Sequence, residues 1–312
     1  MCQTKSILQA FALLSSPLST LALSTMPIID SHLHIWATSS ESSSYPYSPG
    51  QDPPPSLHNE ASVDCLMKQM EAAGVDGALI VQPINHKYDH SYVANAIKKH
   101  PTKFKGILLH DPLLSSEMAV DRLEELVLKG FVGVRFNPYL WPEGMLMSES
   151  GLSVYKRCAE LNVPVGIMCF KGLDLHYDDI VQLIQQSPDT VCILDHMGFC
   201  ALNEKGDKQF EQLLSLSKYS NVLVKVSALF RNTGDEDSFP YNKLKSKRFE
   251  PLLEKYGADR LMMGTDFPFV IETEGGYKGT VDTVNSWVEN YDERNAIMGG
   301  TAQRVFGQWV VS

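Results

Sequence analysis

The stretch Ile28-Ile29-Asp30-Ser31-His32-Leu33-His34 decides how the rest of this chain of 312 residues is interpreted. It starts as an apolar run and ends in two histidines two residues apart. In an extended strand, side chains at positions i and i+2 point to the same face. We therefore expect Asp30, His32 and His34 to project side by side, so that the two imidazoles can share a metal ion. A pair of solvated loop histidines is the alternative.

The composition is that of a large globular protein. Hydrophobic residues make up 44% of the chain and charged residues 21%, which suffices for one large α/β domain or two smaller ones. The formal net charge of −10 argues against nucleic acid and anionic membranes as partners, because both attract basic surfaces. No apolar run reaches the roughly 18 residues that a membrane-spanning helix needs. Six cysteines without a Cys-x-x-Cys pair are typical of a reducing compartment.

The N-terminal segment differs in composition from the remainder. Residues 1–25 contain one Lys, no acidic residue, and many Ser, Thr, Ala and Leu. This is typical of a transit peptide, which predicts a plastid or mitochondrial location. A short apolar signal region, or an unstructured extension of a cytoplasmic protein, is the alternative. We therefore predict a targeting or disordered extension over residues 1–25 and one barrel domain over residues 26–312.

From Met26 onward, apolar β-branched runs alternate with amphipathic runs. The predicted strands are Pro27–His34, Gly77–Pro83, Phe104–Pro112, Phe131–Pro138, Pro164–Phe170, Val191–Gly198, Val222–Phe230 and Arg260–Pro268. The helical patterns include Val63–Ala73, Asp121–Lys129, Ser153–Leu161, Ile180–Gln186, Phe210–Lys218, Phe249–Tyr256 and Thr280–Asn290. Eight such units, about 36 residues each, predict an α/β fold, a single-domain (β/α)8 TIM barrel. A doubly wound open sheet is the alternative, but no Gly-x-Gly-x-x-Gly follows any strand.

Polar residues stand at the ends of six of the eight predicted strands. In such barrels, functional residues gather at the carboxyl ends of the strands. Burying an unpaired charge is costly, so this many polar strand ends indicates a common pocket. The residues are His32, His34, His110, Asp111, Arg135, Asn137, Asp195, His196, Lys225, Ser227 and Asp266.

Five motifs resemble the amidohydrolase superfamily. They are I-I-D-S-H-L-H-I-W at the first strand, G-V-R-F-N-P at the fourth, V-C-I-L-D-H-M-G at the sixth, V-L-V-K-V-S at the seventh and M-M-G-T-D-F-P at the eighth. The resemblance is to the group of lactonases and metal-dependent hydrolases related to 2-pyrone-4,6-dicarboxylate lactonase. It covers Pro27 to about Phe306 and implies a barrel with a hydrolytic site.

The resemblance also implies ligands for a metal ion. His32 and His34 match the paired histidines of the first strand, His196 the sixth-strand histidine and Asp266 the eighth-strand aspartate. Imidazoles and a carboxylate suit Zn²⁺ or Mn²⁺. Many members place a further histidine after the fifth strand, where this chain has Met168-Cys169-Phe170-Lys171. That departure argues against a binuclear centre and leaves one divalent ion or a metal-free site.

We expect Asp266 to act as general base towards water, with His196 as ligand or electrophile. In a metal-free site the three histidines would instead polarise a carbonyl as hydrogen-bond donors.

The predicted substrate is a small anion. Arg135 and Lys225 are cations at strand ends of an acidic protein, and arginine binds carboxylates bidentately. For Lys225, a role as structural partner of Asp195 or Asp266 is the alternative. Arg231 matches a position where relatives place a carboxylate-binding arginine. Asn137 and His110 are predicted pocket-wall groups.

The leading hypothesis is hydrolysis of the C–O ester bond of a small carboxylated lactone, or of a related cyclic or amide substrate. A decarboxylase of an aromatic or muconate-type acid is the second. An inactive barrel that serves as a binding protein is the third. No sequence feature predicts a particular oligomeric state.

Overall fold

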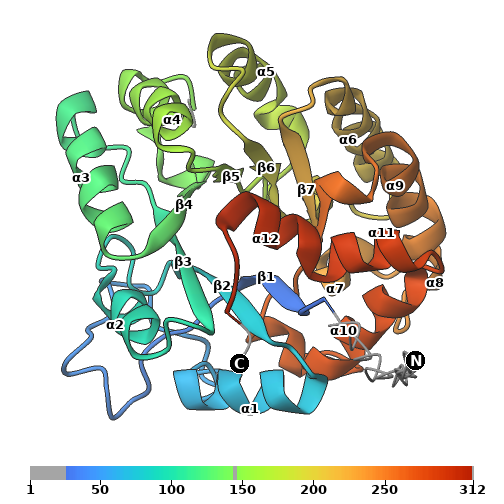
Figure 1. The fold of residues 1–312 in the computed structure, drawn as a ribbon, viewed down its shortest axis with the longest axis horizontal. Helices are drawn as coiled ribbons and strands as arrows, with labels where there is room; N and C mark the ends of the chain where they lie inside the picture. The colour runs from blue at the N-terminus through green and yellow to red at the C-terminus, as the bar shows by residue number, and fades with distance from the viewer. Residues whose placement is uncertain (1–25, 143–145, 311–312) are drawn as a thin grey trace, which may run out of the picture.

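Eight parallel strands form one sheet that curves into a barrel, with the helices packed around it (Figure 1). The computed structural model describes residues 26–142 and 146–310. The strands are neighbours in chain order: β1 (Ile29–Leu33), β2 (Gly77–Val81), β3 (Phe104–Leu109), β4 (Phe131–Phe136), β5 (Val165–Ile167), β6 (Cys192–Leu194), β7 (Val222–Val226) and β8 (Leu261–Met263). A parallel bridge between Leu33 and Phe267 joins the segment after β8 to β1. The predicted single-domain (β/α)8 TIM barrel is therefore confirmed.

The amphipathic runs form the outer layer. The helices are α1 (Val63–Ala73), α2 (Ser91–Lys99), α3 (Ser116–Leu128), α4 (Glu149–Leu161), α5 (Tyr177–Gln186), α6 (Glu204–Ser215), α7 (Leu229–Thr233), α8 (Asn242–Leu244), α9 (Glu250–Tyr256), α10 (Gly276–Trp287), α11 (Tyr291–Asn295) and α12 (Thr301–Phe306). In α1, Leu66 and Met70 form the buried stripe. Ser62 caps its first turn, and Gly74 at φ 68° ends it in the left-handed conformation that glycine adopts freely.

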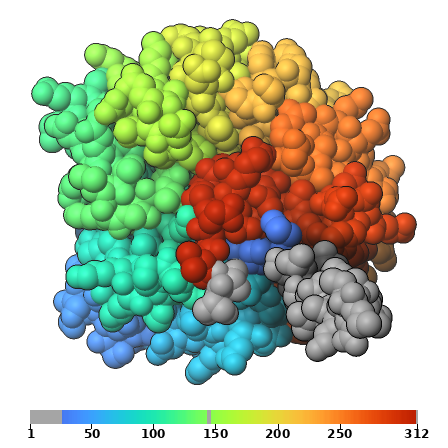
Figure 2. All heavy atoms as spheres, in the orientation of Figure 1, coloured from blue at the N-terminus to red at the C-terminus, as the bar shows by residue number. Residues whose placement is uncertain are grey.

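The amino end of the barrel is closed by the C-terminal segment. Phe306 and Trp309 belong to one apolar cluster with the strand residues Ile29, Leu79, Val81, Ile107, Ile193, Leu223 and Met262. Lys105 Nζ donates to the Phe306 carbonyl at 2.8 Å, and Trp309 Nε1 donates to the Lys103 carbonyl at 3.1 Å. The red C-terminal segment lies over the middle of the face seen in Figure 2. Because the barrel interior is packed at this end, a pocket inside the barrel has room at the opposite, carboxyl end.

Several strands are shorter than the sequence predicts. The predicted strand Val191–Gly198 ends at Leu194, and Arg260–Pro268 ends at Met263. The ladder stops because the backbone turns: His196 has φ 54° and Asp266 has φ 65°, both in the left-handed region. The polar residues predicted at these strand ends therefore lie in the turns that follow the strands.

Helix boundaries also differ from the prediction. Helix α2 is absent from the predicted runs, and α3 begins at Ser116 rather than Asp121 because Ser115 caps it by accepting a hydrogen bond from the Met118 N–H. The predicted N-terminal extension over residues 1–25 lies outside the described residues. Within the described part, no helix combines the length and apolarity needed to cross a membrane.

Buried neutral histidines make this fold sensitive to acid. His90, just before α2, accepts a hydrogen bond at Nε2 from the Leu109 N–H at 3.0 Å, and its Nδ1 faces the Tyr88 carbonyl at 2.9 Å. Burial lowers the pKa of His90 from 6.5 to about 4. Between these pH values the unfolded chain binds a proton that the folded chain does not. The free energy of unfolding therefore falls as the pH falls.

We predict that His90 contributes up to about 1.4 kcal/mol per pH unit to this fall. A His90→Gln variant keeps an acceptor for the Leu109 N–H but has no titratable group, so its stability should depend less steeply on pH between 6.5 and 4. Urea unfolding at several pH values across this window measures both slopes. Equal slopes for parent and variant would contradict the prediction.

Candidate functional site

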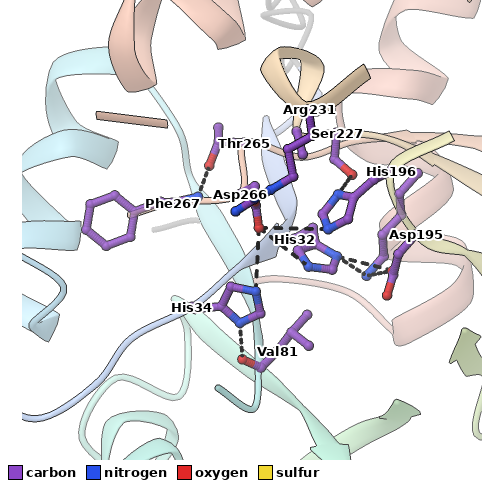
Figure 3. A network of polar contacts seen from close by, with 12 residues as sticks. His32, His34, Val81, Asp195, His196, Ser227, Arg231, Thr265, Asp266 and Phe267 are labelled. Carbon is purple, nitrogen blue, oxygen red and sulfur yellow. Dashed lines mark hydrogen bonds and ion pairs between the residues drawn. The ribbon is translucent and has the colours of Figure 1, made fainter. Parts of the chain in front are cut away.

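His32 and His34 project from the carboxyl end of β1 towards one point (Figure 3). They are 0% and 7% exposed, and their ring centroids are 5.2 Å apart. Asp30 does not join them as the strand alternation predicts. Its carboxylate accepts hydrogen bonds from the Thr265 N–H at 3.0 Å and the Thr265 hydroxyl at 2.6 Å. Asp30 therefore holds the segment after β8 against β1.

The segment after β8 brings Asp266 beside the histidines. The Asp266 N–H donates to the His32 carbonyl at 2.8 Å, and the His34 N–H donates to the Phe267 carbonyl at 2.7 Å. Gly264 permits this close approach, because a Cβ there would lie 2.8 Å from the Cβ of His32. The positive φ of Asp266 turns the chain at the same point, a local strain of the kind that collects at functional sites.

One oxygen of Asp266 is the common neighbour of three imidazoles. Asp266 Oδ1 lies 3.5 Å from His34 Nε2, 3.8 Å from His196 Nε2 and 4.0 Å from His32 Nε2. Candidate ligand atoms of His32, His34 and Asp266 all lie within 4.8 Å of one another. The four residues predicted as metal ligands are thus brought together by segments from β1, β6 and β8.

Each imidazole is oriented through its Nδ1. His34 Nδ1 is 2.8 Å from the Val81 carbonyl, which can only accept, so Nδ1 carries the proton and Nε2 offers a lone pair. His32 Nδ1 lies 3.2 Å from both Asp195 Oδ1 and Lys225 Nζ, and donation to the carboxylate gives the same tautomer. Partners of this kind on the far nitrogen are typical of metal-binding histidines.

His196 follows the same arrangement through a hydroxyl. Its Nδ1 is 2.8 Å from Ser227 Oγ, at the end of β7, and its Nε2 points to Asp266. Burial lowers the pKa of His196 to about 3 and the pKa of His32 well below its usual value. Both rings are therefore neutral at physiological pH, the form that binds a metal ion.

Asp266 is ionised in this setting. Burial would raise its pKa, but the charged guanidinium of Arg231 favours the carboxylate form, and the pKa lies well below the usual value. Arg231 Nε donates to Asp266 Oδ2 at 2.8 Å, which leaves Oδ1 for the imidazole side.

The donor set fits one divalent metal ion. His32 Nε2 is buried and has no hydrogen-bond partner among the described residues, although it lies 4.0 Å from a carboxylate oxygen. A metal ion held by His32, His34, His196 and Asp266 would satisfy this atom and would balance the carboxylate charge. Met168 follows β5 and lines the cavity, and its side chain has no nitrogen or oxygen atom that could bind a second metal ion.

A cavity of about 350 Å³ lies against the metal-binding residues. Its wall includes His34, His196 and Asp266 together with the three predicted substrate residues Arg135, Asn137 and Arg231. The Arg231 guanidinium lies 5.0 Å from the ring centroid of Phe230 and 4.7 Å from that of Phe269. Arg135 Nε lies 3.3 Å from Asp195 Oδ2.

Lys225 does not line the cavity, so of its two predicted roles the structure shows the second, that of a structural partner of Asp195. It is fully buried, and its Nζ lies 3.4 Å from Asp195 Oδ1 and 3.2 Å from His32 Nδ1. Lys225 and Arg135 together balance the buried Asp195 carboxylate and hold its pKa well below the usual value, although burial acts in the opposite direction. Lys225 therefore contacts the candidate metal ligand His32 and its partner Asp195 on the side away from the cavity.

His110 also lies outside the site. Its ring packs against Phe136 and Trp141, with centroid distances of 5.2 Å to each. It lines a different cavity of about 580 Å³ beside α3. The next residue towards the amino end, Leu109, is the one that reaches the candidate site. A position at the carboxyl end of a strand places a residue near the mouth of the barrel, but it does not determine whether the side chain points into the cavity.

Part of the cavity wall was not predicted from the sequence. Gln82 and Asn85 follow β2, a strand that carries no charged residue at its end. Aromatic side chains complete the wall: Trp36, Phe170, Phe199 and Phe269. Gln82 could have been predicted as a wall residue, because it is the first polar residue after the apolar run of β2.

Residues 29–308 match the family model described as Amidohydrolase. The chain belongs to the amidohydrolase family. This amidohydrolase is 24% identical over 291 residues to a 4-sulfomuconolactone hydrolase from Hydrogenophaga intermedia, an alignment that covers 89% of this chain and 88% of the relative.

Solved structures share the fold. One, from Acinetobacter baumannii with citric acid bound, is described as a "probable 2-pyrone-4,6-dicarboxylic acid hydrolase"; it has a TM-score of 0.71 and 21% identity over 91% of this chain and 100% of its own. An amidohydrolase from Burkholderia multivorans with bound zinc has a TM-score of 0.71 and 18% identity over 90% of this chain and 99% of its own. The chain is thus an enzyme of the amidohydrolase superfamily with a donor set for a divalent metal ion.

We predict that the amidohydrolase purified without chelator contains about one equivalent of a divalent metal ion per chain. Changing His32→Ala removes the buried Nε2, so the affinity should fall at least about 100-fold. Elemental analysis and competition with a chromophoric chelator measure content and affinity. The control is His110→Gln, a buried histidine outside the site, which should bind as the parent does. Equal affinities for parent and His32→Ala would contradict the assignment.

Proposed function

We propose that this amidohydrolase hydrolyses the ring C–O ester bond of a small carboxylated lactone, with one Zn²⁺ or Mn²⁺ ion at the barrel mouth. The observation that carries the proposal is the placement of Asp266, whose Oδ1 has three imidazole Nε2 atoms at 3.5 to 4.0 Å, in the wall of a cavity that also contains two arginines. The similarity to a 4-sulfomuconolactone hydrolase supports a lactone as substrate.

The metal ion, when bound, supplies a Lewis acid that polarises the lactone carbonyl and lowers the pKa of water. His32, His34, His196 and Asp266 hold it. Asp266 accepts the proton that water loses as its oxygen bonds to the carbonyl carbon. It then passes that proton to the ring oxygen as the C–O bond breaks, so the product is a hydroxy acid.

The two arginines select an anion. Arg231 Nε donates to Asp266 at 2.8 Å, whereas Arg135 Nε lies 3.3 Å from Asp195 as an ion pair without a hydrogen bond in the described part of the chain. In the described part of the chain, the remaining guanidinium nitrogens of both residues have no hydrogen-bond partner. A substrate carboxylate can therefore accept hydrogen bonds from these nitrogens. The aromatic wall, including Trp36 and Phe269, suits the flat ring that carries it.

We predict lactone hydrolysis that depends on Asp266. An Asp266→Asn variant cannot accept the proton, so kcat should fall at least about 100-fold. A pH-indicator assay on a panel of lactone carboxylates measures the rate, and His110→Gln serves as the control with parental activity. Parent activity that Asp266→Asn leaves unchanged would contradict the proposal, and release of CO₂ from acid substrates would identify a decarboxylase instead.

We also predict that Arg231→Lys and Arg135→Lys lose most of the preference for anionic over neutral lactones. Lysine lacks the planar pair of donors that a carboxylate requires, so the ratio of kcat/KM for the two substrate types should fall about tenfold or more. Steady-state kinetics on a lactone carboxylate and its methyl ester measure this ratio. An unchanged ratio in both variants would show that the arginines do not contact the substrate.

A further inference from the structure

The segment after β5 presents apolar side chains to the cavity. It reads Met168-Cys169-Phe170-Lys171, at the place where the family resemblance leads us to expect a histidine. Met168 and Phe170 line the cavity, whereas Cys169 between them is fully buried in the hydrophobic core. Side chains at i and i+2 of an extended segment share a face, which explains this alternation. The cavity wall is therefore apolar where a further metal ligand was expected.

Phe170 continues this apolar wall out to the solvent. Its side chain lines the cavity and is nevertheless 55% exposed. Among the exposed large apolar side chains of the described residues, Phe170 is the one that lines this cavity. An apolar surface that runs from a binding cavity to solvent is stabilised when a ligand removes it from water.

Ring contacts hold Phe170 in place. Its ring centroid lies 5.5 Å from that of Phe199 and 6.5 Å from that of Tyr139, with both neighbours edge to face. The Tyr139 hydroxyl accepts a hydrogen bond from the Lys171 N–H at 2.5 Å, and Lys171 Nζ lies 4.9 Å from the centre of the Tyr139 ring. Because the ring of Phe170 is already positioned, a ligand that packs on it does not have to order it first.

The same aromatic contacts reach the candidate metal ligands. The ring of Phe199 lies 4.8 Å from that of His196, again edge to face. Phe199 and Phe170 thus form a continuous apolar surface that starts beside a metal ligand and ends in solvent. The two arginines of the cavity lie on other elements, Arg135 in β4 and Arg231 in α7. A ligand whose charge lies at the arginines can therefore place a different group on this surface.

We propose that Met168, Phe170 and Phe199 form a subsite for a hydrocarbon group, and that the substrate is a lactone carboxylate whose ring carries an alkyl or aryl substituent. The inference rests on the proposed lactone hydrolysis. A lactone ring and its carboxylate alone leave the ring of Phe170 in water. A hydrocarbon substituent on a ring carbon covers it, and Phe170 then acts as a specificity-determining residue.

Three probes of one skeleton test the subsite: 5-oxotetrahydrofuran-2-carboxylate and its 3-butyl and 4-butyl derivatives. On at least one butyl probe the parent enzyme should show a kcat/KM about tenfold or more higher than on the unsubstituted probe, because a single buried methylene can be worth about tenfold in an apolar pocket. Phe170→Ser removes the exposed ring. It should lower the ratio of the two kcat/KM values at least about fivefold by slowing the butyl probe.

The ratio separates recognition from damage to the segment, since a disturbed segment slows all probes alike. Leu175→Ser is the matched control, because Leu175 lies in the same connection between β5 and α5, is 59% exposed and does not line the cavity. It should keep the parental ratio. If Phe170→Ser does not fold, Met168→Gln repeats the test at the neighbouring wall residue. A parental ratio in the wall variant, or a parental ratio close to one, would overturn the subsite.

Calorimetric binding of the same probes distinguishes failure of the subsite from failure of the lactonase proposal. Suppose that the parent hydrolyses no probe but binds a butyl probe about tenfold more tightly, with the more negative heat-capacity change of apolar burial. If Phe170→Ser abolishes both differences, the subsite stands and the lactonase proposal fails for this substrate class. Equal hydrolysis of all three probes supports the lactonase and overturns the subsite. Equal binding of the probes, or binding of none, also overturns the subsite.

Discussion

Two backbone hydrogen bonds between β1 and the segment after β8 close the barrel and build the site with the same atoms. The Asp266 N–H donates to the His32 carbonyl, and the His34 N–H donates to the Phe267 carbonyl. Closure therefore sets the distance between the first-strand histidines and the eighth-strand carboxylate. Gly264 makes room for this contact, and Asp30 secures it through Thr265. A sheet left open at this edge would have the same ligands but no site.

Charged residues around the contact between β1 and the segment after β8 balance one another. Two of the buried carboxylates, Asp195 and Asp266, are each paired with an arginine that also reaches the cavity. A buried carboxylate without such partners would be protonated or would destabilise the fold. Lys225 adds the second cation at Asp195, which in turn orients His32. The arginines thus connect the cavity to the candidate metal ligands.

The barrel and the cluster of His32, His34, His196 and Asp266 could be predicted from the sequence for physical reasons. The alternation of apolar and amphipathic runs reflects which residues are buried, and a barrel of parallel strands is covered on both faces. A His-x-His pair in a strand has one geometry, whatever the loops around it do. The partner of a buried polar side chain follows no such repeating pattern. Asp30 is buried against Thr265, and Lys225 lies beneath the cavity, because contacts with other strands decide their direction.

Gln82 and Asn85 in the cavity wall could not be predicted either, because neither residue is charged. The orientation of their amides depends on the carbonyl groups of Gln51, Lys87 and Asp89, which the loops bring within hydrogen-bond distance.

The central claim is that three imidazoles and one carboxylate hold a single metal ion. X-ray absorption spectroscopy of the zinc-loaded protein tests it most directly. We expect a shell of nitrogen and oxygen atoms at about 2.0–2.1 Å, a multiple-scattering pattern typical of imidazole, and no second metal scatterer at about 3.5–4 Å. A sulfur shell at about 2.3 Å, or a metal neighbour, would contradict the account.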